Sequence, residues 1–263
     1  MTTYGSDIYT EPEGDPDTFE NLGPLRALAG VWEGVKGSDQ HPVAEGTEQN
    51  AFVEHYELQP IDRQTNGPQL FYGLRYHTHI TKPGEQETFH DQVGYWLWEP
   101  ATESVTLTLG IPRAQVLLAS GPAAPDATDF ELKATLGSEV YGILSNPFLY
   151  ESFRTVSYRI HVIAHENGTW SYEEEGMLQI PGRKDLFSHI DRNTLTRIEP
   201  PELNPLARAA TRPASGGDGS LGIGSLRQAG LDGSLDEGLD ESIRNGSLGI
   251  GSLRQSGLNG APL

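Results

Sequence analysis

Apolar and polar residues alternate with a period of two over most of the chain between residues 25 and 198. Such alternation is typical of β-strands that bury one face and expose the other. It recurs in segments separated by turn-forming residues, which predicts roughly ten strands with hardly a helix. The predicted strands lie around residues 31–36, 52–58, 70–76, 89–97, 105–111, 114–120, 130–136, 153–164, 169–178 and 186–198.

The connections between the predicted strands support one fold class. Residues 82–85 (Lys-Pro-Gly-Glu) and Asn167-Gly168 are tight-turn sequences of the kind that join neighbouring antiparallel strands. One closed antiparallel up-and-down barrel is therefore favoured over a pair of domains. A barrel of about eight strands already encloses a small ligand, so one of about ten should hold something larger and flat. We expect the function to reside in this interior.

The two ends of the chain differ from the alternating body. The first 24 residues are acidic and contain several prolines, which predicts an irregular leader, and residues 25–28 predict one short helical turn. Beyond about residue 200 the chain is rich in Gly and poor in large apolar residues, so it cannot build its own core. The predicted organisation is a disordered leader (1–24), an all-β barrel (25–198), a linker (199–217) and a disordered tail (218–263).

The decapeptide GSLGIGSLRQ occurs twice in the tail, letter for letter, at residues 219–228 and 246–255. An ordinary low-complexity linker has no reason to repeat ten residues in order. Small neighbours allow an extended backbone to lie close to a host surface while aliphatic side chains enter pockets. The candidate anchors are Leu221, Ile223, Leu226, Leu248, Ile250 and Leu253. The repeats resemble the targeting peptides by which cargo proteins are packaged into encapsulin shells, which implies a shell protein as partner.

Composition excludes several classes of function. The formal net charge of -19 disfavours nucleic acid and anionic membranes as partners. The absence of cysteine excludes disulfides, thiolate zinc sites, cysteine nucleophiles and iron–sulfur clusters. No segment has the length and hydropathy of a membrane span, and the leader lacks the apolar run of a secretory signal. We therefore expect a cytoplasmic protein.

Eight histidines are the main candidates for chemistry in this chain. His189 lies in the last predicted strand, where Asp191 and Asn193 share its face, so it can project from the wall that closes the barrel. The alternative for His189 is a core histidine satisfied by a neighbour. His77 and His79 share a strand face as a metal pair or a wet polar face would.

The chain resembles the nitrobindins, a family of haem-binding β-barrels related in shape to fatty-acid-binding proteins. The likeness rests on Gly30-x-Trp32-x-Gly34 near the start of the body, nearly continuous strands, and a histidine in the closing strand. The segment Phe89-His90-x-x-x-Gly94-Tyr95 is similar to a mid-barrel stretch of the family. The family pattern has a third glycine two residues after the second, where this chain has Lys36, with Gly37 one place later.

The resemblance implies a haem b cofactor in the barrel, with His189 as the axial ligand of the iron. It also implies that Trp32, Gly30 and Gly34 contribute to cofactor binding. Independently, with no cysteine and two methionines, a haem iron here can be held by histidine or tyrosine and little else. The implied activity is binding of nitric oxide and isomerisation of peroxynitrite to nitrate, inside an encapsulin compartment.

Further residues are expected to surround the predicted ligand His189. A hydrogen-bond partner should orient the His189 imidazole, and Asp191 or Asn193 on the same strand face is expected to do so. His41 and His90 are candidates for the distal side.

Two alternative functions remain open from the sequence. The same barrel could carry a fatty acid or another apolar molecule without a metal, as a binding module rather than an enzyme. A non-haem metal site built on His77 and His79 is the second alternative.

Overall fold

The computed structural model describes residues 4–202. The predicted tail, nearly all of the predicted linker, and the anchors Leu221, Ile223, Leu226, Leu248, Ile250 and Leu253 lie outside these residues. The elements are the 3₁₀-helix η1 (Gly23–Leu28), β1 (Gly30–Val43), β2 (Gly46–Pro60), β3 (Gln64–Asn66), β4 (Gln69–Thr81), β5 (Thr88–Glu99), β6 (Ser104–Ile111), β7 (Gln115–Pro122), β8 (Asp129–Thr135), β9 (Ile143–Ser145), α1 (Pro147–Ser152), β10 (Arg154–Ala164), β11 (Trp170–Gln179) and β12 (Phe187–Glu199).

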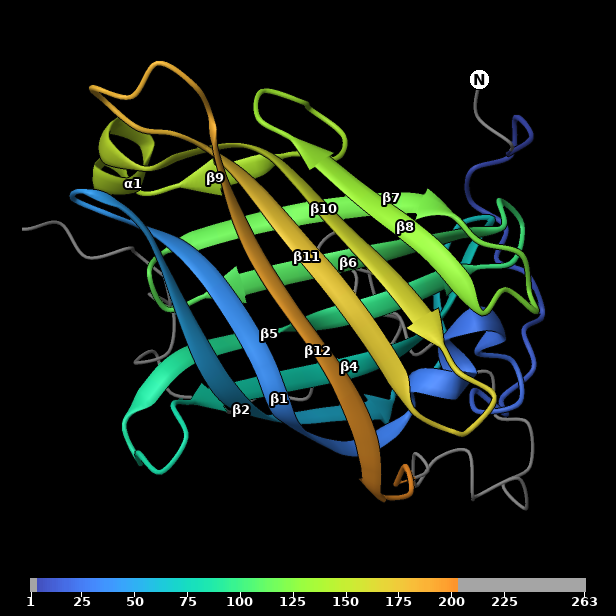
Figure 1. Ribbon diagram of the computed structural model, residues 1–263. Coiled ribbons are helices and arrows are strands. Elements are labelled where there is room, and N and C mark those ends of the chain that lie inside the picture. The colour runs from blue at the N-terminus through green and yellow to red at the C-terminus, as the bar shows by residue number, and fades with distance from the viewer. Residues whose placement is uncertain (1–3, 203–263) are drawn as a thin grey trace, which may run out of the picture. The chain divides into compact units, whose positions relative to one another are not determined.

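Ten antiparallel strands of this part of the chain form a closed up-and-down barrel, as the alternation predicted. Each long strand pairs with the next long strand along the chain, β12 pairs with β1, and β2 pairs with β4 across the short β3 (Figure 1). The short β9 adds to β7 outside this circuit. The barrel wall thus has no long free edge that would invite pairing with another chain.

Apolar residues before and within η1 close one end of the barrel. Leu22, Leu25 and Leu28 are fully buried, and the Trp32 indole N–H donates to the Leu28 carbonyl oxygen at 2.8 Å. The short turn predicted at residues 25–28 is part of this 3₁₀-helix, which begins next to Pro24. The helix α1 lies at the opposite end of the barrel (Figure 1). No helix within residues 4–202 is long and apolar enough to cross a lipid bilayer.

The leader has neither helix nor strand between residues 4 and 22. Part of it nevertheless contacts the barrel, because the Asp15 backbone N–H donates to the Tyr72 hydroxyl at 3.0 Å. The Glu11 carboxylate accepts a hydrogen bond from the Thr65 hydroxyl at 2.9 Å.

Strand β1 contains a β-bulge that changes which residues face inward. Gly34 pairs with Glu54 and Gly37 pairs with Phe52, so β1 has one residue more than β2 in this interval. Before the bulge the even-numbered residues Trp32 and Gly34 are buried, and after it the odd-numbered residues Gly37 and Asp39 are buried. A bulge reverses the alternation because successive side chains of a strand point to opposite faces.

We predict that Gly37→Ala destabilises the barrel by about 1–3 kcal/mol, because a Cβ atom at this position would collide with the buried ring of Phe52. Denaturant unfolding of the variant and the wild type measures this. Gly110→Ala is the matched control, since a Cβ atom there would meet its nearest side chain at 3.7 Å. Equal losses of stability in the two variants would contradict the role given to Gly37.

Candidate functional site

A cavity of about 460 Å³ lies inside the barrel. This volume is in the range of sites that bind small molecules and cofactors. At one end the cavity is lined by Pro42 near the β1–β2 turn, Arg113 in the β6–β7 turn and Leu149 of α1. Because Arg113 is also exposed to solvent, this end is the mouth of the cavity. The cavity extends inward to Trp170, whose ring packs against Trp32 near the closed end.

The inward positions of β12 place a row of polar side chains in the barrel wall. His189 and Asp191 line the cavity, while Asn193 is buried behind them. The period of two predicted this shared face. Across the pairing with β11, the facing pairs are Gly176 with His189, Glu174 with Asp191, and Tyr172 with Asn193. Because Gly176 has no side chain, the space beside the His189 imidazole on the neighbouring strand is open.

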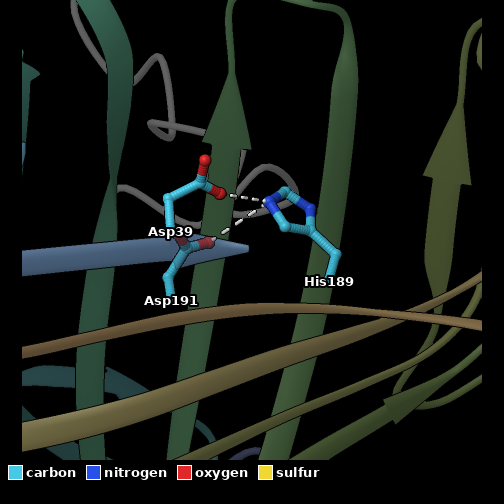
Figure 2. Close-up of side chains that lie close together, drawn as sticks. All are labelled: Asp39, His189 and Asp191. Carbon is cyan, nitrogen blue, oxygen red and sulfur yellow. Dashed lines mark hydrogen bonds and ion pairs between the residues drawn. The ribbon is translucent and has the colours of Figure 1, made fainter. Parts of the chain in front are cut away.

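The His189 imidazole is held by two carboxylates (Figure 2). Its Nε2 atom is 2.9 Å from an oxygen of Asp39 and 3.6 Å from an oxygen of Asp191. The expectation that Asp191 or Asn193 orients the ring is therefore only partly right, because the closer partner is Asp39 and the Asn193 amide donates to Glu54 instead. Simple alternation through β1 does not place Asp39 on the same face as Trp32, since the bulge intervenes.

Burial and the neighbouring charges have opposing effects on the pKa values of His189 and Asp39. Burial alone would lower the pKa of His189, but the hydrogen bond to Asp39 and the charges of Asp191 and Asp39 outweigh it and raise that pKa. Burial would raise the pKa of Asp39, yet its hydrogen bonds with His189 and His41 keep that pKa below its ordinary value. Burial and the neighbouring charges of Glu174 and Asp39 raise the pKa of Asp191 well above its usual range. The three side chains therefore share protons as a unit.

The structure brings His41 and His90 to the same cavity as His189. His41 Nδ1 is 2.5 Å from the second carboxylate oxygen of Asp39, so this aspartate bridges two imidazoles. His90 Nε2 lies 3.3 Å from the side-chain oxygen of Gln92, and burial lowers the pKa of His90. Their assignment to the distal side of a ligand stays a prediction.

The other residues predicted to bind the cofactor do not line the cavity. Trp32 is fully buried toward the closed end, and Gly30 begins β1 with a φ of 133°. Gly34 acts indirectly, because a Cβ atom there would collide with the Asn193 side chain. That close approach lets the Asn193 amide reach Glu54 at 2.9 Å. A direct role of Trp32, Gly30 and Gly34 in binding stays a prediction.

Two glutamates of the cavity lining have different partners; Glu54 is buried and Glu174 is half-buried. Glu54 accepts hydrogen bonds from the Thr78 hydroxyl, the Tyr172 hydroxyl and the Asn193 amide, at 2.8–2.9 Å. Burial raises the pKa of Glu54 despite these three donors. For Glu174, burial raises the pKa to about 7. A carboxyl group that titrates near neutral pH inside a cavity can accept or donate a proton there.

Two further polar atoms belong to residues that line the cavity and have no hydrogen-bond partner of good geometry. The Trp170 indole N–H and the Tyr158 hydroxyl are buried, and neither makes a hydrogen bond within the described part of the chain. Buried polar groups are normally paired, so these two atoms are exceptions to that rule.

The two histidines of the alternative metal site lie away from this cavity. His77 Nε2 is 2.8 Å from the Asp91 carboxylate, and His79 Nε2 is 2.9 Å from the Thr88 hydroxyl. Within residues 4–202, the ligand atoms of Asp39, His189 and Asp191 are the only group of three or more that converge as a metal ion would require.

Residues 21–197 match the family described as the THAP4-like, heme-binding beta-barrel domain. The chain belongs to this family. The resemblance to the nitrobindins is thereby confirmed at the level of a haem-binding β-barrel. Among solved structures, the barrel is similar to the crystal structure of Rv2717c from M. tuberculosis, with a TM-score of 0.49 and 18% sequence identity over 68% of this chain and 96% of that chain. No curated protein sequence matches the chain.

The lining of this THAP4-like barrel fits a haem ligated by histidine. The cavity-lining tyrosines Tyr56, Tyr158 and Tyr172 are poor ligands, because burial raises the pKa of each hydroxyl well above its ordinary value of 10.0. Imidazole is the remaining type of haem-iron ligand among the side chains that line the cavity. Of the three histidines there, His41 and His189 both contact the Asp39 carboxylate, a partner of the kind that commonly orients a metal-binding imidazole. His189 in addition has the side-chain-free Gly176 beside it on the neighbouring strand.

We predict that Glu174→Gln changes how the stability of the THAP4-like barrel depends on pH. The pKa of Glu174 is raised from 4.5 to about 7, so the folded protein retains a proton that the unfolded chain releases between these pH values. The wild type should therefore lose stability relative to the variant, on the order of 3 kcal/mol, between about pH 4.5 and pH 8. Denaturant unfolding at both ends of this range measures the difference.

Glu166→Gln, in the exposed β10–β11 turn, is the matched control and should follow the wild type at every pH. If the wild type and Glu174→Gln differ by the same free energy at both ends of the range, Glu174 does not titrate between them.

Proposed function

We propose that this THAP4-like barrel binds haem b with His189 as the axial ligand of the iron. The observation that carries the proposal is the imidazole held at the cavity wall by Asp39, at 2.9 Å. Both carboxylate contacts use Nε2, which leaves Nδ1 as the ring nitrogen available to iron. A carboxylate on one ring nitrogen fixes the imidazole and increases the basicity of the other nitrogen.

The proposed activity is the binding of nitric oxide and the isomerisation of peroxynitrite to nitrate. A haem bound through one histidine would supply an open coordination position for either molecule. The protein would contribute an enclosed cavity with His90, which the lowered pKa keeps neutral near pH 7. A neutral imidazole can donate or accept a hydrogen bond to a small polar ligand without adding charge.

A fatty acid is a less suitable occupant of this cavity. The apolar tail of a fatty acid in the interior would lie against four carboxyl side chains, those of Asp39, Glu54, Glu174 and Asp191. Contact with an apolar chain gives such polar groups no hydrogen-bond partner. The lipid-carrier alternative predicts a colourless protein that releases a lipid on extraction.

We predict that His189→Ala abolishes the Soret band that the wild type shows after addition of haemin, because it removes the proposed iron ligand. Absorbance titration measures the uptake. Free imidazole added to the variant should restore the band, since it can occupy the space that the side chain vacates. Haem uptake should be unchanged in His79→Ala, which alters an imidazole outside the cavity.

An unchanged spectrum in His189→Ala would remove the ligand assignment. A wild-type protein that contains a stoichiometric non-haem metal and takes up no haemin would argue instead for an ion held by Asp39, His189 and Asp191.

We further propose that the chain is cargo of an encapsulin shell in the cytoplasm. The support is the exact repeat of GSLGIGSLRQ at residues 219–228 and 246–255. Once one copy is bound, the other rebinds at a high effective concentration, which can raise avidity by roughly 10²–10⁴ if both binding sites are within reach. Confinement would keep the haem and its oxidant substrate together.

We predict that removal of residues 217–263 prevents co-purification with the shell protein, because both repeats are lost. Removal of a single copy should weaken loading less than removal of both. Quantification of cargo per shell after co-expression measures the loading. Entry of the truncated barrel into shells at the wild-type level would show that the repeats are not the targeting signal.

A further inference from the structure

Arg113 is the one cationic side chain among the Lys and Arg residues of 4–202 that lines the cavity. It lies in the β6–β7 turn at the mouth and is exposed to solvent. The lining also contains four carboxyl side chains, those of Asp39, Glu54, Glu174 and Asp191. The guanidinium at the mouth is therefore the lining side chain best suited to pair with a carboxylate of a ligand.

The β6–β7 turn is held in place by neighbouring elements. The Asn146 side-chain amide donates to the Arg113 carbonyl oxygen at 2.6 Å, and the Asn146 backbone N–H donates to the Ala114 carbonyl oxygen at 3.0 Å. Asn146 also caps α1 by accepting from the Leu149 backbone N–H at 3.0 Å. Ala114 has a φ of 54°, a left-handed conformation that is unfavourable for a residue with a side chain. The backbone that carries Arg113 is thus fixed.

The Arg113 guanidinium has no hydrogen bond or ion pair with any other described residue. Arg159, in contrast, pairs with the carboxylates of Glu131 and Glu173, and Arg183 donates to the backbone carbonyl oxygens of Val43 and Gly46. An arginine that extends from a fixed backbone at a cavity mouth and has no partner can bind a carboxylate of the ligand, often through two parallel hydrogen bonds.

We infer that Arg113 binds the propionate carboxylates of the haem and thereby sets the orientation of the macrocycle in the cavity. This inference rests on the proposed haem binding. The propionates are directed to Arg113 at the mouth and the apolar edge of the ring is directed inward, since carboxylates placed inside would meet Glu54 and Glu174. In the strand order, β6 and β7 lie across the barrel from β12, so Arg113 and His189 contact the macrocycle from opposite walls.

The test compares two porphyrins and two proteins in a thermodynamic cycle. Absorbance titration gives the Kd of wild type and Arg113→Gln for haemin and for haemin dimethyl ester, in which both carboxylates are neutral. Arg113→Gln should weaken haemin binding roughly three- to tenfold, as expected for a solvent-accessible ion pair, and leave binding of the ester unchanged. Added salt should weaken haemin binding by the wild type but not by Arg113→Gln, because salt screens the ion pair between Arg113 and the propionates.

Arg113→Lys should retain part of the haemin affinity, since it keeps the charge without the planar guanidinium. Arg75→Gln is the matched control and should behave as the wild type, because Arg75 is an exposed arginine of β4 outside the cavity. Equal losses of affinity for both porphyrins, or no loss for either, would overturn the role of Arg113 while leaving haem binding intact. Failure of the wild type to bind either porphyrin would overturn the proposed function and this inference together.

Discussion

The bulge in β1 is the constraint on which the arrangement of the cavity depends. Side chains alternate strictly along a strand, so Trp32 at the closed end and Asp39 near the mouth, seven residues apart, can face the same interior only if one residue is added between them. The addition occurs between Gly34 and Gly37, where β1 is one residue longer than β2. These two glycines allow Asn193 and Phe52 to approach the backbone closely. Without the bulge, Asp39 would point to solvent and His189 would lose its closest partner.

The same bulge explains what could be predicted from the sequence and what could not. Period-two alternation identified the ten barrel strands and placed His189 with Asp191 and Asn193 on one inward face, because β12 is regular there. The alternation could not identify Asp39 as an inward residue, because Asp39 is an odd-numbered position of β1 and the inward Trp32 is an even-numbered one. One sequence feature did indicate the bulge. The third glycine of the family motif is expected at the position of Lys36, but in this chain it is Gly37, one residue later. The short elements β9 and α1 were not predicted, because residues 136–152 have no alternation and their structure depends on contacts such as the Asn146 cap.

Two glutamates of the cavity lining differ in their hydrogen-bond partners. Glu54 accepts hydrogen bonds from three side chains of β4, β11 and β12, so its carboxyl group joins strands that are far apart in sequence. Glu174, also in the cavity lining, has none of these three donors, and burial raises its pKa to about 7. A fully bonded buried carboxyl group rigidifies a wall, whereas one with few partners keeps the capacity to exchange a proton with a ligand.

Assembly of the candidate site requires closure of the barrel. Asp39 belongs to the first long strand and His189 to the last, and they meet because β12 pairs with β1. Asp39 also contacts His41 on its own strand, so one carboxylate at the β1–β12 pairing contacts two imidazoles of the cavity. A ligand that binds His189 in the orientation set by Asp39 would therefore stabilise the closed barrel relative to any state in which β1 and β12 separate. Ligand binding at this site and barrel closure would then be linked through Asp39.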